Sequence, residues 1–302
     1  MSADVKMDVY LIYAETQLHA GRGAELGVVD LPIQRERTTG FPIIQGVKGA
    51  LRAFVRTRND KNLEEALFGS RPSEKGEQAA QEEETVQKEE TTQESEGTKP
   101  GGVAFSEAKI LLFPVRNNER LFVWVTCPLA LARFLKVAKD EEALKVVNNL
   151  NLGEHEAVAL FESKDNEIWL EEIAVQRKDV NTDELKKLFE KISDCAPIDL
   201  LKNKLKENVV IVSDKLFSQI VETMTEVVPR VRIDTTGTVK EGALWYEEYL
   251  PQDTVMYFVA RPTGYASNNV LEDLKNVIND KLVNIGGKET VGKGMVWVKS
   301  WG

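Results

Sequence analysis

The stretch at residues 18–36, "LHAGRGAELGVVDLPIQRE", combines a histidine, three glycines and an isolated acid, Asp30. These residue types suit either acid–base chemistry or a glycine loop that binds phosphate. Asp30 stands between apolar Val29 and Leu31, so its carboxylate is expected either to be held by a partner or to be presented at a loop tip. His19 follows a strand-like run, where a structural role is the commoner alternative to a catalytic one.

The spacing of these glycines excludes a dinucleotide-binding fingerprint. Gly21, Gly23 and Gly27 follow a G-x-G-x-x-x-G pattern, one residue longer than the fingerprint requires. No helix begins here, because Pro32 biases the residue before it toward extended backbone. Residues 14–45 are therefore predicted to form a long loop, and loops of this length in compact domains are mostly functional or disordered.

A second glycine stretch, "GKETVGKG" at residues 287–294, imitates a phosphate loop but ends in glycine where a hydroxyl is required. It also follows a predicted helix and leads into a strand, the reverse of the usual order. Its amides and lysines favour an anion-binding concavity. A glycine-rich hairpin without a ligand fits the pattern equally well. The residues concerned are Gly286, Gly287, Lys288, Gly292, Lys293 and Gly294.

A third basic cluster lies around a predicted helix start. Lys48 and Arg52 are four residues apart and share one helix face. With Gly46 and Gly49 beside them, this helix start suits a phosphate, and a solvated helix face is the alternative. Two further cations, Arg35 and Arg37, precede the cluster.

The charge is unevenly distributed over the 302 residues. The formal net charge is −10, yet residues 71–100 contain nine Glu against four basic residues and carry half of that charge. This polar segment cannot bury enough apolar surface to order itself, so it is predicted to be a disordered insertion. A basic groove elsewhere remains compatible with the acidic total, because the field that steers a polyanion is local.

Two cysteines without metal-ligand neighbours suit a reducing compartment. The sequence has neither a signal-peptide pattern nor a stretch long enough to span a bilayer. These features predict a cytoplasmic protein with no membrane partner.

Apolar periodicity predicts a mixed α+β fold. Strand patterns occupy residues 5–15, 108–115, 120–128 and 254–262, and helix patterns occupy 47–58, 129–150, 182–192, 214–224 and 268–280. The order of the first elements matches the start of a ferredoxin-like βαββαβ unit. Residues 226–250 form a predicted hairpin around "DTTGT", with Arg230 and Arg232 on one arm and Trp245 and Tyr246 on the other.

Four stretches together resemble the RAMP superfamily of CRISPR ribonucleoproteins, in particular the backbone subunit of the type III-B (Cmr) effector complex. They are "LHAGRGAELGVVDLPIQRERTTGFPIIQGVKGALR" (18–52), "FSEAKILLFPVR" (105–116), "RVRIDTTGTVKEGALWYEEYLP" (230–251) and "GGKETVGKGMVWV" (286–298). The resemblance implies a single RAMP domain, 1–302. Its modified ferredoxin-like/RRM palm would comprise residues 1–70, 103–224 and 252–302, with the insertion at 71–102 and a β-hairpin thumb at 225–251.

The resemblance also implies a function. Copies of the chain would stack as a helical filament on a CRISPR guide RNA, beside other Cmr subunits, and cleave paired single-stranded target RNA at regular intervals. A ribose 2′-hydroxyl would attack the adjacent phosphate and give a cyclic phosphate. The matching acid is Asp30, with His19, Glu247 and Tyr249 as further catalytic candidates. A divalent metal, Mg or Mn, would be bound weakly or transiently.

The implied RNA-binding residues combine the three basic clusters with the hairpin. They are Arg35, Arg37, Gly46, Lys48, Gly49, Arg52, Arg230, Arg232, Trp245, Gly286, Gly287, Lys288, Gly292, Lys293 and Gly294. Aromatic and arginine side chains on a hairpin suit base stacking and phosphate contact. Two alternatives stay open: a non-catalytic RNA-binding scaffold, and a nucleotide-dependent phosphotransferase suggested by the two imitated glycine motifs.

Overall fold

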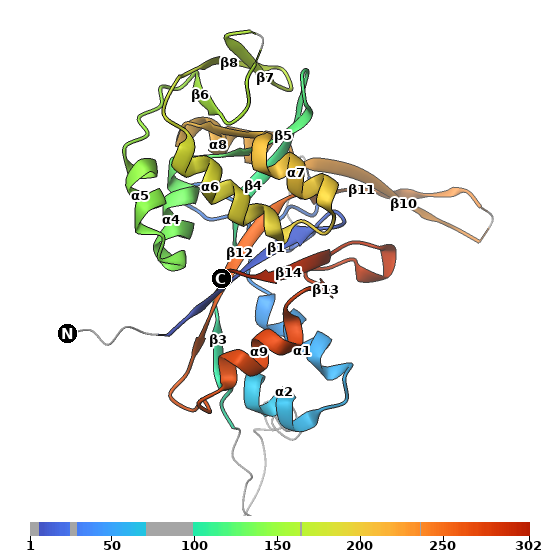
Figure 1. Ribbon diagram of the computed structural model, residues 1–302. Helices are drawn as coiled ribbons and strands as arrows, with labels where there is room; N and C mark the ends of the chain where they lie inside the picture. The colour runs from blue at the N-terminus through green and yellow to red at the C-terminus, as the bar shows by residue number, and fades with distance from the viewer. Residues whose placement is uncertain (1–5, 25–28, 71–98, 164, 236) are drawn as a thin grey trace, which may run out of the picture.

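The computed structural model describes residues 6–24, 29–70, 99–163, 165–235 and 237–302 (Figure 1). The helices in this part of the chain are α1 (Val47–Arg56), α2 (Lys61–Phe68), α4 (Pro128–Ala138), α5 (Glu141–Asn148), α6 (Asp183–Ile192), α7 (Asp199–Glu207), α8 (Asp214–Thr223) and α9 (Val270–Ile278), with short 3-10 turns at Ser193–Cys195 and Glu289–Val291.

The strands fall into a large mixed sheet and a separate hairpin. They are β1 (Asp8–Ala14), β2 (Ile43–Ile44), β3 (Val103–Phe105), β4 (Ala108–Asn117), β5 (Leu121–Thr126), β6 (Glu156–Ala159), β7 (Glu167–Leu170), β8 (Ile173–Arg177), β9 (Val209–Val212), β10 (Glu226–Ile233), β11 (Val239–Tyr249), β12 (Val255–Pro262), β13 (Lys281–Asn284) and β14 (Met295–Ser300). The main sheet runs β13-β14-β1-β12-β4-β5-β9-β6-β8-β7.

Alternating side chains of β1 show how the sheet is buried on both faces. Tyr10 and Ile12 belong to one core, with residues of α1, α2, α8 and α9. Leu11 and Tyr13 belong to the other, with residues of α4, α5, α6 and α7. Because successive strand residues point to opposite faces, a strand covered on both sides is nearly all apolar, as "VYLIYA" is.

The predicted α+β class is confirmed, and the strand at 5–15 and the helix at 47–58 form as β1 and α1. The single helix expected at 129–150 is wrong. The first helix ends before Lys139, which adopts left-handed backbone with φ 57°, and a new helix begins at Glu141 with Asp140 as its N-cap. The Asp140 carboxylate accepts a hydrogen bond from Ala143 N at 3.1 Å and caps α5.

Most of the predicted insertion at 71–102 lies outside the described residues. Its last part is described and packs against α2. Ser70 N donates to Lys99 O at 2.9 Å, and Gly102 N donates to Ala66 O at 2.9 Å. A Cβ on Gly102 would lie 2.6 Å from Ala66 O, so this close return requires glycine.

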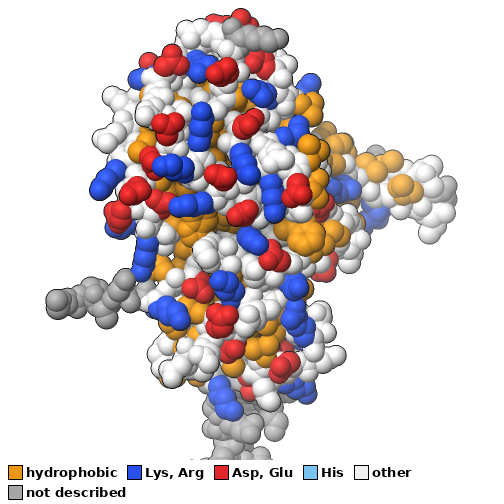
Figure 2. All heavy atoms as spheres, viewed as in Figure 1, with side chains coloured by type: hydrophobic (Ala, Val, Ile, Leu, Met, Phe, Trp, Pro, Cys, Tyr) orange, Lys and Arg blue, Asp and Glu red, His pale blue; other side chains and the backbone are white. Residues whose placement is uncertain are grey.

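The predicted hairpin forms from β10 and β11, which make a separate two-stranded sheet and project from the body (Figure 1). Arg230 pairs with Trp245, and Val231 with Leu244. Cross-strand partners share a face, so the hairpin has a polar face and an apolar one. Exposed apolar side chains follow the hairpin in Figure 2: Val227, Val231, Ile233, Val239 and Leu244. No helix within the described ranges is both long and apolar enough to cross a membrane.

Candidate functional site

Asp30 is fixed to the base of the hairpin by β11. Its Oδ2 accepts a hydrogen bond from Tyr246 N at 2.7 Å. The next residue, Leu31, forms a parallel bridge with Glu247, through Leu31 N to Tyr246 O at 3.1 Å and Glu248 N to Leu31 O at 3.1 Å. Within the described chain, Asp30 Oδ1 has no hydrogen-bond partner. One carboxylate oxygen is therefore anchored while the other can take a proton.

Glu247, the bridge partner of Leu31, is almost fully buried, at 2% exposure. Its Oε1 accepts from Lys288 Nζ at 2.6 Å and from Trp245 Nε1 at 2.8 Å. Its Oε2 accepts from Arg230 Nε at 3.2 Å and from the Tyr249 hydroxyl. Burial alone would raise the pKa of Glu247, but the hydrogen bonds from Lys288, Tyr249 and Trp245 outweigh it and lower that pKa to about 2.

Tyr249 and His19 complete the buried side of the site. Burial and the hydrogen bond to Glu247 raise the pKa of Tyr249, so its hydroxyl stays protonated. The His19 ring centroid lies 5.4 Å from that of Tyr249, and His19 Nδ1 is 2.8 Å from Glu248 O. A carbonyl oxygen only accepts, so Nδ1 carries the proton and Nε2 is the nitrogen left for chemistry.

The C-terminal glycine loop packs directly on the His19 segment. Gly287 N donates to His19 O at 2.7 Å. Gly286 has φ +97°, and a Cβ there would lie 2.6 Å from His19 O. Gly294, with φ +83°, is equally crowded against Ile285 O. Gly286 therefore permits the close approach of this loop to the His19 segment, and Lys288, two residues further on, reaches Glu247.

Lys293 joins the same constellation. Its Nζ lies 5.3 Å from the centroid of the Tyr249 ring and donates to Gln17 Oε1. The structure thus gathers eight predicted residues from three distant segments: His19, Asp30, Arg230, Trp245, Glu247, Tyr249, Lys288 and Lys293.

Sequence reasoning missed Glu248, which ties the N-terminal loop to the hairpin. Its carboxylate accepts from Arg35 Nη2 at 2.5 Å, from Ile33 N at 3.0 Å and from the Thr225 hydroxyl at 2.8 Å. Arg35 also donates to Gly40 O and Val221 O. RNA contact by Arg35 stays a prediction, since its guanidinium is here committed to protein acceptors. Two adjacent acids in one strand were the only signal for Glu248.

The start of α1 is the most open of the predicted phosphate sites. A Cβ on Gly46 or Gly49 would meet nothing within 4 Å, and Lys48 is exposed. In the part of the chain that the structure describes, neither Lys48 nor Arg37 has a side-chain partner. Arg232 is exposed on β10, and Gly292 is open with φ +77°. RNA binding by these residues stays a prediction that the open geometry allows.

Arg52, by contrast, is used to brace α1 against α2. It donates to Glu64 Oε1 at 2.8 Å and to Gly69 O at 2.8 Å, and Arg56 adds a bond to Glu64 Oε1 at 3.0 Å. Hydrogen bonding from Arg56, opposed by burial and reinforced by Arg52, lowers the pKa of Glu64 from its ordinary 4.5 to about 2. RNA binding by Arg52 stays a prediction, and its clear role here is structural.

Glu64→Gln should therefore destabilise the fold by about 1.5–3 kcal/mol at pH 7, the range for hydrogen bonds to charged groups. The folded pKa lies below the unfolded one, so this stabilisation is present above pH 4.5 and is lost as the pH falls through about 2. Urea unfolding at pH 7, 5 and 3 measures it. Glu65→Gln, a substitution of the exposed neighbouring residue, is the control. The same difference in unfolding free energy between wild type and Glu64→Gln at every pH would contradict the prediction.

The described residues do not fit a resident metal ion. No group of three or more His, Cys, Asp or Glu among them could hold one. Both Glu247 oxygens are occupied by cationic and neutral donors, which leaves Asp30 Oδ1 as the available carboxylate oxygen at the site. A metal acting here would have to take most of its ligands from RNA and water.

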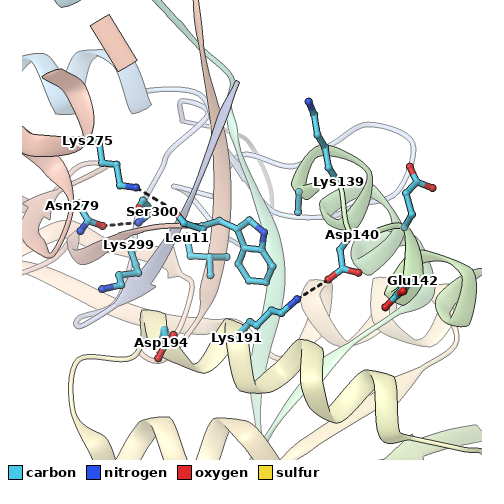
Figure 3. A pocket seen from close by; sticks show the side chains of 14 residues that line it. Leu11, Lys139, Asp140, Glu142, Lys191, Asp194, Lys275, Asn279, Lys299 and Ser300 are labelled. Atoms are coloured by element: carbon cyan, nitrogen blue, oxygen red, sulfur yellow. Dashed lines mark hydrogen bonds and ion pairs between the residues drawn. The ribbon is translucent and has the colours of Figure 1, made fainter. Parts of the chain in front are cut away.

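A cavity of about 890 Å³ opens far from these residues, near the C-terminus (Figure 3). Three of the four lysines that line it are held by protein acceptors. Lys191 Nζ lies 3.3 Å from Asp140 Oδ2, Lys275 Nζ donates to Gly302 O at 3.2 Å, and Lys299 Nζ pairs with Asp280. The surface between α6 and α7 likewise intersperses acids and bases (Figure 2). Most of the positive charge that lines this cavity is therefore paired with protein groups.

Comparison with known proteins decides the family. The model of the RAMP superfamily matches residues 11–297, a range that includes every residue of the constellation. The chain belongs to the RAMP superfamily. The family assignment agrees with the resemblance drawn from the glycine loops and the hairpin.

One sequence relative and two solved structures show which RAMP proteins this chain is similar to. It is 37% identical to the CRISPR system Cmr endoribonuclease Cmr4 of Pyrococcus furiosus, over 97% of this chain and 95% of the relative. The crystal structure of oligomeric Cmr4 from the same organism aligns with TM-score 0.70 and 30% identity, over 98% of both chains. A chain of the type III-B Cmr-beta complex bound to cognate target RNA aligns with TM-score 0.69 and 21% identity, over 98% and 97%, and shows the shared fold.

Proposed function

We propose that this chain is the backbone subunit of a type III-B Cmr effector complex and the endoribonuclease that cleaves guide-paired target RNA. The observation that carries the proposal is Asp30, whose Oδ2 is anchored to Tyr246 N while Oδ1 is available, on a segment that bridges to Glu247 and its bound cations through Leu31. The full-length similarity to a Cmr endoribonuclease supports it. Its partners are the guide RNA, the target RNA, further copies of the chain and other Cmr subunits, and it acts with them in the cytoplasm.

The chemistry follows from the positions of the side chains. Asp30 Oδ1 accepts the proton of a ribose 2′-hydroxyl, and that oxygen attacks the adjacent phosphorus. The P–O bond to the next nucleotide breaks, which gives a 2′,3′-cyclic phosphate and a 5′-hydroxyl. His19 supplies the proton for the departing oxygen through Nε2, and the cations around Glu247 favour the negative phosphate. Strain imposed on the RNA by binding brings the attacking and leaving oxygens into line.

The proposal is tested with a target RNA that carries single 2′-deoxy substitutions. A complex assembled from the wild-type chain should lose cleavage only at the bond that follows each deoxy nucleotide, while binding is unchanged. Cleavage that continues at a deoxy position would contradict 2′-hydroxyl attack. Guide-dependent binding without any cleavage would favour the non-catalytic scaffold.

We also propose that a divalent metal supports cleavage and is held only once RNA is bound. EDTA should stop cleavage and Mg or Mn should restore it, while calorimetry on the free chain detects no stoichiometric metal binding. The reason is the donor set, which offers one available carboxylate oxygen. Metal that copurifies with the free chain at one ion per chain, or cleavage that persists in EDTA, would contradict this expectation.

A further inference from the structure

We propose that Lys288 is a further catalytic residue of this site, the cation that neutralises the charge developing on the scissile phosphate, and that Glu247 is the positioning residue that holds it. The inference rests on the proposed RNA cleavage. It gives Glu247 a role other than that of an acid or a base.

The hydrogen bonding of Glu247 carries the first step. A carboxylate that accepts four hydrogen bonds at 2% exposure has no accessible lone pair for a ribose proton. The neighbouring Tyr249 donates its own proton to Glu247, so it is not poised to protonate a leaving group. What this buried anion does is fix the cations around it.

Among these cations, Lys288 is the one whose side-chain contacts within the described residues are to Glu247 alone. Arg230 donates from Nε to Glu247 and from Nη2 to Tyr249, and Lys293 contacts Gln17 and the Tyr249 ring. The Lys288 ammonium has a single protein acceptor among the described residues, Glu247 Oε1, and its side chain is 31% exposed. An ammonium has three donors, so two remain for phosphate oxygens.

The backbone of Lys288 supports a functional placement. Its φ is +67°, a left-handed conformation that is unfavourable for a non-glycine residue and persists where the surroundings enforce it. The enforcing contacts are the bond from Gly287 to His19 O and the ion pair with Glu247. Glu247 is also the bridge partner of Leu31, the residue next to Asp30. Glu247 is therefore joined to the ammonium on one side and to the Asp30 segment on the other.

In the reaction, Asp30 takes the 2′-hydroxyl proton while the Lys288 ammonium donates hydrogen bonds to a non-bridging phosphate oxygen. No proton leaves Lys288, and no bond to it forms or breaks. Because the charge on those oxygens grows in the transition state, the interaction is stronger there than with bound substrate, so it raises the rate more than the affinity.

The test removes and then restores the ammonium in the full-length chain. Lys288→Met should lower single-turnover cleavage by about 10²–10³-fold, as loss of a transition-state donor does. Affinity for an uncleavable 2′-deoxy target should change by less than about tenfold, the loss of one phosphate contact among many. Lys186→Met, on the exposed surface of α6, is the control and should cleave at the wild-type rate.

Lys288→Cys supplies a chemical rescue, because Cys127 and Cys195 are both buried and the new thiol can be alkylated selectively before assembly. Bromoethylamine, which restores an ammonium, should recover cleavage, whereas iodoacetamide should not. Glu247→Gln, which keeps an acceptor for Lys288, should slow cleavage and leave the shape of the pH–rate profile unchanged.

Equal recovery with both reagents, or wild-type cleavage by Lys288→Met, would overturn the assignment of Lys288. A flattened pH–rate profile in Glu247→Gln would overturn the positioning role, because Glu247 would then be the titrating base. Failure of the proposed function is a different result, since the wild-type complex itself would not cleave a bound target, and the Lys288 assignment would fall with it.

Discussion

Replacing Asp30 with Asn is expected to slow target cleavage by about 10²–10⁴-fold, the usual contribution of a positioned acid–base group. Asn keeps an oxygen that can accept from Tyr246 N, so the loop that Asp30 anchors should stay in place. The variant should therefore assemble and bind target RNA like the wild type. Single-turnover cleavage and target binding, measured on the same assembled complex, separate the two effects.

Asp30→Ala provides the comparison, because it also deletes the hydrogen bond to Tyr246 N. It should lose cleavage and in addition be less stable than Asp30→Asn by about 0.5–1.5 kcal/mol, the net value of one hydrogen bond. Asp179→Asn, a highly exposed acid paired with Arg177, is the surface control. Cleavage at the wild-type rate by Asp30→Asn would remove Asp30 from the mechanism.

Gly286→Ala is expected to be the most damaging small substitution at the site. Backbone strain at φ +97° costs about 1–3 kcal/mol, and contact with His19 O adds to it because the Cβ would lie 2.6 Å from that atom. The C-terminal loop would have to move away from His19 and take Lys288 with it. Both the urea midpoint and the cleavage rate should fall.

Gly287→Ala is the matched control in the same loop. Its φ is not in the left-handed region, and the nearest atom to its Cβ would be His19 O at 3.6 Å, an ordinary contact. The free energy of unfolding of this variant, measured with urea, should stay within about 0.5 kcal/mol of the wild-type value. Equal destabilisation by the two substitutions would show that close approach to His19 is not what Gly286 provides.

Local patterns in the sequence predicted the regular elements well. Alternation of apolar residues gave β1, helical spacing gave α1, and "DTTGT" between two apolar runs gave the hairpin, whose Gly237 has φ +84°. The end of α4 at Lys139 was missed because the helical spacing of apolar residues continues across it. A single left-handed residue does not change that spacing. Short elements such as β2 and β13 carry too few residues to show a period.

Sequence patterns pointed to residues that the fold brings together, but not to the partners that each side chain binds. Arg35 and Arg52 stand out in the sequence as basic residues near glycines. Their acidic partners, however, are determined by tertiary packing. Glu248 is 213 residues from Arg35, and Glu64 lies on another helix than Arg52. The pattern of the glycines near residue 290 fits either a phosphate-binding concavity or a hairpin without a ligand, and the folded chain uses Gly286 to approach His19 closely. Sequence spacing cannot separate these uses, because both need a missing side chain.

The central claim is tested most directly by mapping the products of one end-labelled, guide-complementary RNA cut by the assembled wild-type complex. We expect a ladder of regularly spaced products that end in 2′,3′-cyclic phosphate, absent when the RNA does not match the guide. Stable binding of the matched RNA without cleavage would contradict the claim, and so would cuts at irregular positions or products ending in a 3′-hydroxyl.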